Sequence, residues 1–173
     1  MQPAPIPDND KERLAALRAL LILDTPPEQR FDRITEFAAA EFDMPMALIT
    51  LIDEKRQWFK SCVGIESGET ARETSFCGHA IMHDSTLVVH DAHADPRFHD
   101  NPFVTGTPFV RFYAGAPLIL PSGHAVGTLC LIDSKPRDLD DIALSILSTL
   151  RDLAVSELIA QGSSALDDKE GDA

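Results

Sequence analysis

Apolar residues recur at helical spacing in the N-terminal part of the chain. The spacing of three and four positions predicts an amphipathic helix over residues 10–24, with an apolar stripe of Leu14, Leu17 and Leu21. The stretch TPPE then has the pattern of a capping box with proline in the first turn. We therefore expect a second helix that begins at Thr25. Its apolar stripe comprises Phe31, Ile34, Ala38 and Phe42.

Five segments have the apolar content and the length of β-strands. MALITLID (46–53) is apolar almost throughout, which predicts a strand buried on both faces. QWFKSCV (57–63) follows a polar turn and is its expected hairpin partner. TLVVHD (86–91) predicts a short strand, and RFYAGAPLIL (111–120) and HAVGTLCLID (124–133) predict a second hairpin. Strands joined largely by hairpins and flanked by helices are typical of the α+β class.

Other segments connect these strands. We expect a polar loop over residues 64–74, a short helix over 75–83 and a long loop over 92–109. A loop of that length in a compact domain usually carries function or is disordered. The last helix begins near Asp138, and its apolar stripe is wider than one buried face requires.

The ends of the chain differ in composition from its middle. Residues 1–9 are polar and rich in proline, which predicts a disordered N-terminus, and residues 161–173 predict a flexible acidic tail. Residues 10–160 have the length of one domain.

Charge and cysteine content limit the partners and the compartment. The formal net charge is −13, which repels nucleic acid and anionic membrane surfaces, so we expect neither as a partner. No apolar run has the length of a membrane span, and the first residues do not have the pattern of a secretion signal. Three widely spaced cysteines suit reduced thiols better than a disulfide framework. These features predict a cytoplasmic protein.

The segment FCGHAIMHD (76–84) has a spacing that suggests a metal site. On a helix, however, His79 and His83 share a face that Cys77 does not occupy, whereas the ligands of zinc must converge. We therefore interpret Cys77 as a small buried apolar residue and predict no metal. The alternative is a two-histidine site completed by Asp84, Asp91 or His93.

The sequence does not contain the short motifs of common enzyme classes. The chain contains no GxGxxG, no GxxxxGK[ST] and no GxSxG. Its acidic residues stand mostly in turns and at helix starts, where capping explains them. No residue pattern identifies a cofactor, and we predict that the chain is not an enzyme.

Two long segments resemble bacterial GAF domains. They are LDTPPEQRFDRITEFAAAEFDMPMALITLIDEKRQWFKSCVG (23–64) and TSFCGHAIMHDSTLVVHDAHADPRFHDNPFVTGTPFVRFYAGAPLILPSGHAVGTLCLIDSKPR (74–137). The resemblance runs from about Leu14 to Leu158 and is strongest to domains that precede histidine kinases and diguanylate cyclases. It implies a central antiparallel sheet of five or six strands, with the terminal helices on one face. On the other face, the short helix and the long loop would cover a pocket.

The resemblance implies a stand-alone sensory or regulatory domain for signal transduction. Residues 159–173 are too few for a kinase or a cyclase; a part cut from a longer protein is the alternative. The expected partners are a small-molecule ligand, a second copy bound through the N- and C-terminal helices, and an unidentified downstream signalling protein. We expect the pocket to be lined by Phe76, Cys77, His79, Asp91, Phe98, Arg111 and Tyr113, with Arg111 as an anchor for an anion.

The resemblance also raises an enzymatic alternative. FCGHA (76–80) is similar to the Val-Cys-Gly-Thr-Ala of free methionine sulfoxide reductases, in which Cys77 would match a redox cysteine. The segment that holds the catalytic cysteine of those enzymes corresponds to the stretch after Asp91, and no cysteine occurs there before Arg111. Without the attacking thiolate this chemistry cannot begin. A divergent reductase or a thiol-based redox sensor is therefore the alternative to a binding module.

Overall fold

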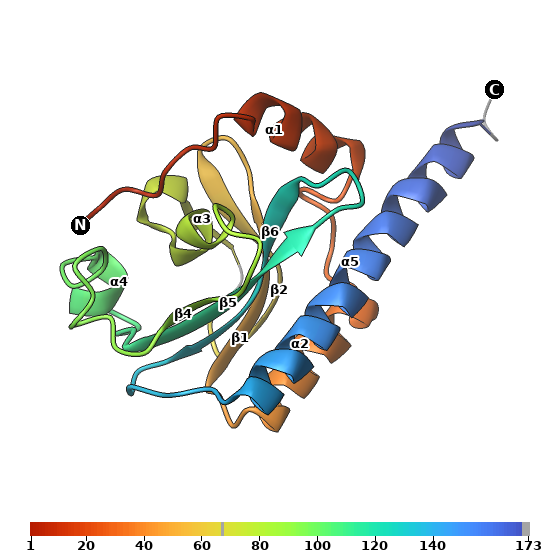
Figure 1. Ribbon diagram of the computed structural model, residues 1–173. Helices are drawn as coiled ribbons and strands as arrows, with labels where there is room; N and C mark the ends of the chain where they lie inside the picture. Colours follow the sequence, from red (N-terminus) through yellow and green to blue (C-terminus); the bar gives the residue numbers. More distant parts are fainter. Residues whose placement is uncertain (67, 171–173) are drawn as a thin grey trace.

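Strand β1 (Met46–Ile52) lies in the middle of the sheet and is buried along its whole length, as its continuous apolar run predicts. It pairs antiparallel with β2 (Arg56–Val63) on one side and with β6 (Ala125–Asp133) on the other. The complete sheet has six strands in the order β3-β2-β1-β6-β5-β4, and its neighbouring strands are antiparallel. The predicted α+β class is confirmed (Figure 1).

This computed structural model describes residues 1–66 and 68–170, and the side chains of residues 165–170 are left aside. The other strands are β3 (Glu69–Ala71), β4 (Leu87–Val89) and β5 (Phe112–Ile119). The helices are α1 (Asp10–Ala19), α2 (Gln29–Glu41), the 3-10 helix η1 (Arg72–Thr74), α3 (Phe76–Ala80), α4 (Pro102–Thr105) and α5 (Asp141–Glu170).

The sheet separates two apolar clusters because successive side chains of a strand point to opposite faces. Along β1, Ala47, Ile49 and Leu51 belong to the cluster covered by α2 and α5. Met46, Leu48 and Ile52 belong to the cluster on the other face, where α3 and α4 lie (Figure 1). The two faces therefore have different covers: long helices on one, and short helices with loops on the other.

Helix α1 lies across the end of the sheet, near the turn from β1 to β2 (Figure 1). Arg13 is buried there and donates from Nη1 to the carbonyl of Ile52 at 2.7 Å. Leu14 and Leu17 are buried within the domain itself. Leu14 and Leu17 of the expected stripe are thus covered by their own chain, whereas Leu21 follows the end of the helix at Ala19 and is exposed.

The start of the second helix differs from the prediction. Helix α2 begins at Gln29, and Thr25 does not cap it. Thr25 Oγ1 instead donates to the carbonyl of Ile22 at 2.6 Å and accepts a hydrogen bond from Lys60 Nζ at 2.8 Å. Lys60 is buried and also pairs with Glu28. The hydroxyl of Thr25, which would accept from a helix amide in a capping box, is therefore bound to Lys60 instead.

Two segments expected to be loops contain regular structure. The stretch 64–74 holds β3 and η1, and the long loop 92–109 holds α4, which is capped by Asn101 and has Pro102 in its first turn. Asn101 Oδ1 accepts from the amide of Phe103 at 2.9 Å. All three elements are short, and apolar periodicity does not reveal elements of three or four residues.

The two ends of the chain are more ordered in the structure than their composition suggests. Residues 1–7 run past α3 as an extended segment, in which Ala4 is buried and its amide donates to the carbonyl of Glu73 at 2.9 Å. Helix α5 continues to Glu170, so residues 161–170 of the expected flexible tail are helical. Residues 171–173 lie outside the described residues. Within the described part, no helix is both long enough and apolar enough to cross a membrane.

Candidate functional site

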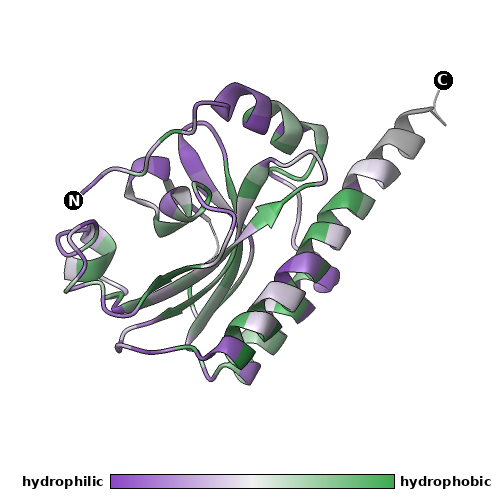
Figure 2. Cartoon of the chain, viewed as in Figure 1, coloured by the Kyte–Doolittle hydropathy of each residue, from purple (hydrophilic) through white to green (hydrophobic). Residues whose placement is uncertain are grey.

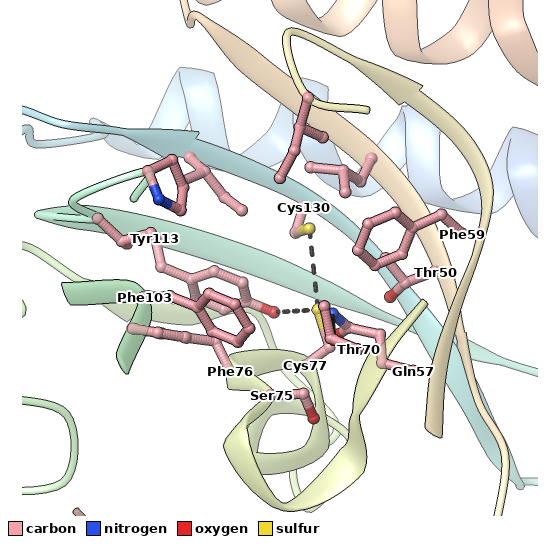
Figure 3. A pocket seen from close by; sticks show the side chains of 15 residues that line it. Thr50, Gln57, Phe59, Thr70, Ser75, Phe76, Cys77, Phe103, Tyr113 and Cys130 are labelled. Carbon is pink, nitrogen blue, oxygen red and sulfur yellow. Dashed lines mark hydrogen bonds between the residues drawn. The ribbon is translucent and has the colours of Figure 1, made fainter. Parts of the chain in front are cut away.

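A cavity of about 50 Å³ lies between the sheet and the cover formed by α3, α4 and their loops (Figure 3). Its wall is mostly apolar, and it includes the two cysteines Cys77 and Cys130. The lining residues are Leu48, Thr50, Gln57, Phe59, Ile65, Thr70, Ser75, Phe76, Cys77, Phe103, Pro108, Val110, Tyr113, Cys130 and Ile132. Such a mostly apolar hollow with a few polar groups is typical of small-molecule sites.

The floor of the cavity comes from the central strands. Leu48 and Thr50 stand two positions apart on β1 and therefore face the same side of the sheet. Thr50 lies opposite Thr128 of β6, and their hydroxyl oxygens are 3.2 Å apart. Cys130 follows two positions after Thr128 on the same face. The alternation of β1 and β6 thus brings Thr50 and Cys130 to the floor, while Thr128 contacts Thr50 without lining the cavity.

Gln57 of β2 lines the cavity, and its side chain has an unpartnered polar atom. Its side-chain nitrogen Nε2 donates to Thr70 Oγ1 of β3 at 3.1 Å. Its carbonyl oxygen Oε1 is buried and has no hydrogen-bond partner. Gln57 is only 8% exposed, so bulk water does not satisfy this oxygen. An unsatisfied buried acceptor costs free energy, and a ligand that donates a hydrogen bond to it would recover that cost.

Helix α3 is fixed closely against its surroundings. Ser75 caps it, since Ser75 Oγ accepts from the amide of Gly78 at 3.0 Å and donates to the carbonyl of Arg72 at 2.6 Å. A Cβ at Gly78 would lie 2.6 Å from Cβ of Ala4 and 2.7 Å from Ser75 Oγ, so a larger residue does not fit there. This cap directs Phe76 and Cys77 towards the sheet.

Tyr113 and Cys130 converge on Cys77 at the floor of the cavity (Figure 3). Tyr113 Oη donates to Cys77 Sγ at 3.2 Å, and the sulfur atoms of Cys77 and Cys130 are 3.8 Å apart. The ring of Tyr113 passes over Gly115, where a Cβ would lie 2.0 Å from the phenol oxygen. The phenol therefore reaches Cys77 because position 115 has no side chain.

The two thiols of this pair have different acidities. Burial raises the pKa of Cys77, but hydrogen bonds from Cys130, Thr128, Thr50 and Tyr113 outweigh burial and lower that pKa to about 7. The hydrogen bond to Cys77 and burial both raise the pKa of Cys130 well above its ordinary value. Cys77 is therefore the thiol that ionises first.

An aromatic stack supports the cavity from the side of α3. The rings of Phe76 and Phe98 are stacked, with their centroids 4.1 Å apart, and the ring of Phe76 lies 5.2 Å from that of Tyr113. Phe98 is fully buried behind Phe76 and does not line the cavity. Of the seven residues that we expected in the pocket, Phe76, Cys77 and Tyr113 line this cavity.

His79 lies on the opposite side of α3 from the cavity. Its Nε2 is 3.2 Å from the carbonyl of Gln2, to which it donates, and its ring meets the edge of Phe98. Burial lowers the pKa of this imidazole. His79 therefore anchors the N-terminal segment. Among the described residues, no group of three or more histidine, cysteine or acidic side chains is arranged to hold a metal ion.

Asp91 and Arg111 form an ion pair away from the cavity. Arg111 donates from Nε and Nη2 to the two oxygens of Asp91, each at 2.7 Å. The hydrogen bonds from Arg111 lower the pKa of Asp91 to about 2. The guanidinium that we expected to anchor an anionic ligand is therefore bound by a carboxylate of its own chain, and neither residue lines the cavity.

Several lining residues were not identified from the sequence, in particular Thr50, Gln57 and Cys130. Each stands in a predicted strand, so alternation indicates which of them share a face. Which residues lie opposite one another depends on strand order and register. The periodicity of apolar residues in the sequence reveals neither the order nor the register. Gln57 was the clearest missed signal, because a polar amide stands directly before the apolar pair Trp58 and Phe59 in a predicted strand.

Comparison with known proteins identifies the family. The model of the GAF domain family matches residues 26–158, which is most of the chain. A cyclic di-GMP phosphodiesterase of Pseudomonas aeruginosa is 42% identical over 137 residues, which cover 79% of this chain. The chain spans only 23% of the length of that relative, so the similarity concerns one part of it.

Solved structures agree on the fold. The GAF domain of an Acinetobacter phosphoenolpyruvate-protein phosphotransferase has a TM-score of 0.65 at 18% identity, covering 91% of this chain and 96% of its own. A free methionine-R-sulfoxide reductase of Neisseria meningitidis, solved with its substrate, has a TM-score of 0.63 at 15% identity, covering 95% and 99%. The sheet order, the two differently covered faces and the matching family model lead to one conclusion: the chain belongs to the GAF domain family.

Proposed function

We propose that this GAF domain is a sensory module for signal transduction that binds a small neutral molecule in the cavity between the sheet and α3. One observation carries the proposal: Gln57, whose buried side-chain carbonyl oxygen has no partner, lines a cavity that is otherwise largely apolar. The lining set contains no Asp, Glu, Lys, Arg or His, which disfavours a charged ligand. A volume of about 50 Å³ limits the ligand to a few non-hydrogen atoms in this state of the protein.

The chemistry of the wall specifies the ligand further. Phe59, Phe76 and Phe103 favour an apolar or aromatic body, since aromatic rings provide large contact surfaces. The acceptor at Gln57 favours a ligand with one N–H or O–H donor. A site that is built to accept a hydrogen bond discriminates against an isostere that lacks the donor, because the buried acceptor is then left unpaired.

Pyrrole and furan are matched probes for this proposal. Both are flat five-membered rings of nearly equal size, and only pyrrole has an N–H donor. We expect pyrrole to shift the amide resonances of residues around the cavity in an NMR titration, and to bind about tenfold more tightly than furan. Gln57→Met, which removes the acceptor, should abolish this preference.

Thr70→Val is the matched control. It removes the hydrogen bond from Gln57 Nε2 but leaves the acceptor Oε1 in place, so the preference for pyrrole should remain. If wild-type protein binds furan as well as pyrrole, or if neither probe shifts resonances at the cavity, the proposal is wrong.

We also propose that the domain acts without catalysis, through a downstream signalling protein. The stretch after Asp91 contains no cysteine before Arg111, where a reductase of this fold would need one. The similarity to part of a cyclic di-GMP phosphodiesterase supports an output connected with a signalling enzyme. The three cysteines are free thiols, which supports a reducing compartment such as the cytoplasm.

A second copy of the chain is the other partner that we propose. The outer surface of α2 and α5 exposes Phe37, Ile142 and Leu153, and hydrophobic segments recur along α5 (Figure 2). A hollow between these helices has an apolar part and a charged part, and its lining residues are Ile34, Phe37, Leu150, Leu153, Arg30, Arg33 and Glu157. Exposed apolar surface on paired helices is typical of a helical interface.

Sedimentation equilibrium tests the dimer. We expect the wild-type chain to sediment as a dimer and Leu153→Glu as a monomer, because a carboxylate would replace an apolar contact within the interface. Ile6→Glu, at an exposed position outside these helices, is the control and should stay dimeric. A wild-type monomer would exclude this interface.

A further inference from the structure

We propose that Cys77 and Cys130 form a hydroperoxide-reactive dithiol at the floor of the cavity, in which Cys77 is oxidised and Cys130 closes a disulfide. This proposal goes beyond ligand binding and does not depend on it. It rests on the placement of two thiols and one phenol, and on a hollow that adjoins both sulfur atoms.

The geometry of the pair is the first argument. The sulfur atoms of Cys77 and Cys130 are 3.8 Å apart, although the residues come from α3 and β6 and are far apart in the sequence. A disulfide requires about 2.05 Å between the sulfur atoms, so the two must approach by roughly 2 Å. Rotation of the side chains supplies movement of this size, and both thiols are free in the structure.

The environment of Cys77 is the second argument. Tyr113 Oη donates a hydrogen bond to Cys77 Sγ at 3.2 Å, which stabilises a thiolate there more than a thiol. The lowered pKa of Cys77 is consistent with this geometry, and the raised pKa of Cys130 indicates that this residue remains a thiol. The thiolate is the nucleophile in thiol oxidation.

Access is the third argument. Both cysteines line the cavity, and its volume of about 50 Å³ exceeds the roughly 15 Å³ that one water molecule needs on this measure. Hydrogen peroxide has two non-hydrogen atoms and fits. Bulky thiol oxidants, in contrast, do not fit a hollow of this size.

The chemistry balances with a hydroperoxide as the oxidant. The Cys77 thiolate attacks the terminal peroxide oxygen, so that an S–O bond forms, the O–O bond breaks, and the leaving alkoxide takes the proton of the original thiol. Cys77 is then a sulfenic acid. The sulfur of Cys130 attacks that of Cys77 while the Cys130 proton passes to the sulfenic oxygen, so a disulfide forms, the S–O bond breaks, and water leaves. In total, two thiols lose two electrons and the hydroperoxide is reduced to an alcohol and water.

Cys62 provides an internal control. It is more exposed than either member of the pair, its Sγ contacts the carbonyl of Ile65 at 3.4 Å, and burial together with Asp32 raises its pKa. If exposure determined reactivity, Cys62 would be oxidised first. If the environment of the thiolate determines it, Cys77 will be oxidised first.

The experiment is peptide mapping of the wild-type chain after treatment with hydrogen peroxide near pH 7. The protein is unfolded, its remaining thiols are alkylated, and the cysteine peptides are identified by mass spectrometry. We expect a peptide pair joined through Cys77 and Cys130, formed on the order of tenfold faster than Cys62 is oxidised. Dithiothreitol should restore both thiols.

Variants separate the two roles. In Cys130→Ser, Cys77 should accumulate as a sulfenic acid that is trapped by dimedone added together with the denaturant. In Cys77→Ser, the trapped species should be absent. Cys62→Ser should form the disulfide at the wild-type rate. The proposal is wrong if Cys62 is oxidised before Cys77, or if Cys62 is oxidised and no disulfide forms between Cys77 and Cys130. Neither result affects the interpretation of the pyrrole experiment.

Discussion

Tyr113 Oη donates a hydrogen bond of 3.2 Å to Cys77 Sγ, and Gly115 is the residue that leaves room for the phenol. Tyr113 and Gly115 share one face of β5, whereas Cys77 reaches the same point from α3. The contact therefore joins the cover of the cavity to its floor. A change at this point is expected to affect both the acidity of the thiol and the placement of α3.

Tyr113→Phe should raise the pKa of Cys77 above about 7, because the phenylalanine ring keeps the packing but removes one hydrogen bond to the thiolate. The measurement is the pH dependence of alkylation by iodoacetamide in a Cys62→Ser background. The same variant unfolded in urea gives the ordinary thiol value for reference. A midpoint unchanged from that of the parent protein would show that Tyr113 does not stabilise the thiolate.

Val110→Phe should fill the cavity and prevent the binding of pyrrole. Val110 is buried and lines the hollow, so the larger ring occupies the volume of the ligand. Overpacking is expected to lower the free energy of unfolding by about 1–3 kcal/mol without loss of the fold. Met82→Phe adds a ring at an exposed position outside the lining and should bind pyrrole like the wild type. Equal binding by Val110→Phe would place the ligand elsewhere.

Asp10→Ala should destabilise the domain by roughly 3 kcal/mol. Asp10 accepts hydrogen bonds from Arg13 at 2.7 Å and from Arg72 at 2.8 Å, and both arginines are almost fully buried. Without this carboxylate, two guanidinium groups remain buried beside each other. Burial raises the pKa of Asp10, but the hydrogen bonds from Arg72 and Arg13 lower it by more than burial raises it. The net pKa is below the ordinary value, so the carboxylate stays ionised.

Urea denaturation measures this effect, and Asp8→Ala is the control. Asp8 is exposed, so its replacement should change the free energy of unfolding by less than about 0.5 kcal/mol. Equal stabilities of the two variants would mean that the pairing of Asp10 contributes little to the fold.

His79→Gln should reduce the loss of stability between about pH 7.5 and about pH 5. Burial lowers the pKa of His79 below its ordinary value of 6.5, so the unfolded chain binds the proton first. The stabilisation is therefore complete above that ordinary value and is lost as the pH falls below it. Glutamine can still donate to the carbonyl of Gln2 but does not titrate. The urea midpoints of both proteins at the two pH values provide the test, and parallel decreases would contradict it.

The centre of the sheet was predictable from the sequence because one strand is a nearly continuous apolar run. Met46–Ile52 is buried at every position, as a continuous apolar run requires. The resemblance to GAF domains supplied the position of the pocket. Short elements such as α4 were not predictable, because their ends depend on local hydrogen bonds, here those of Asn101.

The site was only partly predictable, for a different reason. Phe76 and Cys77 are neighbours in the sequence, whereas Cys130 meets Cys77 only through strand order and register. The partner of Arg111 is twenty positions away, and nothing in a charge pattern shows that Asp91 is bound to it. Contacts between distant elements are a property of the tertiary structure. From its residue type alone, Arg111 was expected to bind an anionic ligand, whereas in the structure it is paired with Asp91.

The central claim, that the cavity holds a small neutral molecule, is tested most directly by native mass spectrometry of the chain purified from its own organism. The native mass is compared with the mass of the same sample after denaturation. We expect the wild-type chain to lose the mass of one small molecule on denaturation. The Val110→Phe variant, produced in the same organism, should show no such difference between its native and denatured masses. Equal native and denatured masses for the wild type, or the same excess mass in both proteins, would contradict the account.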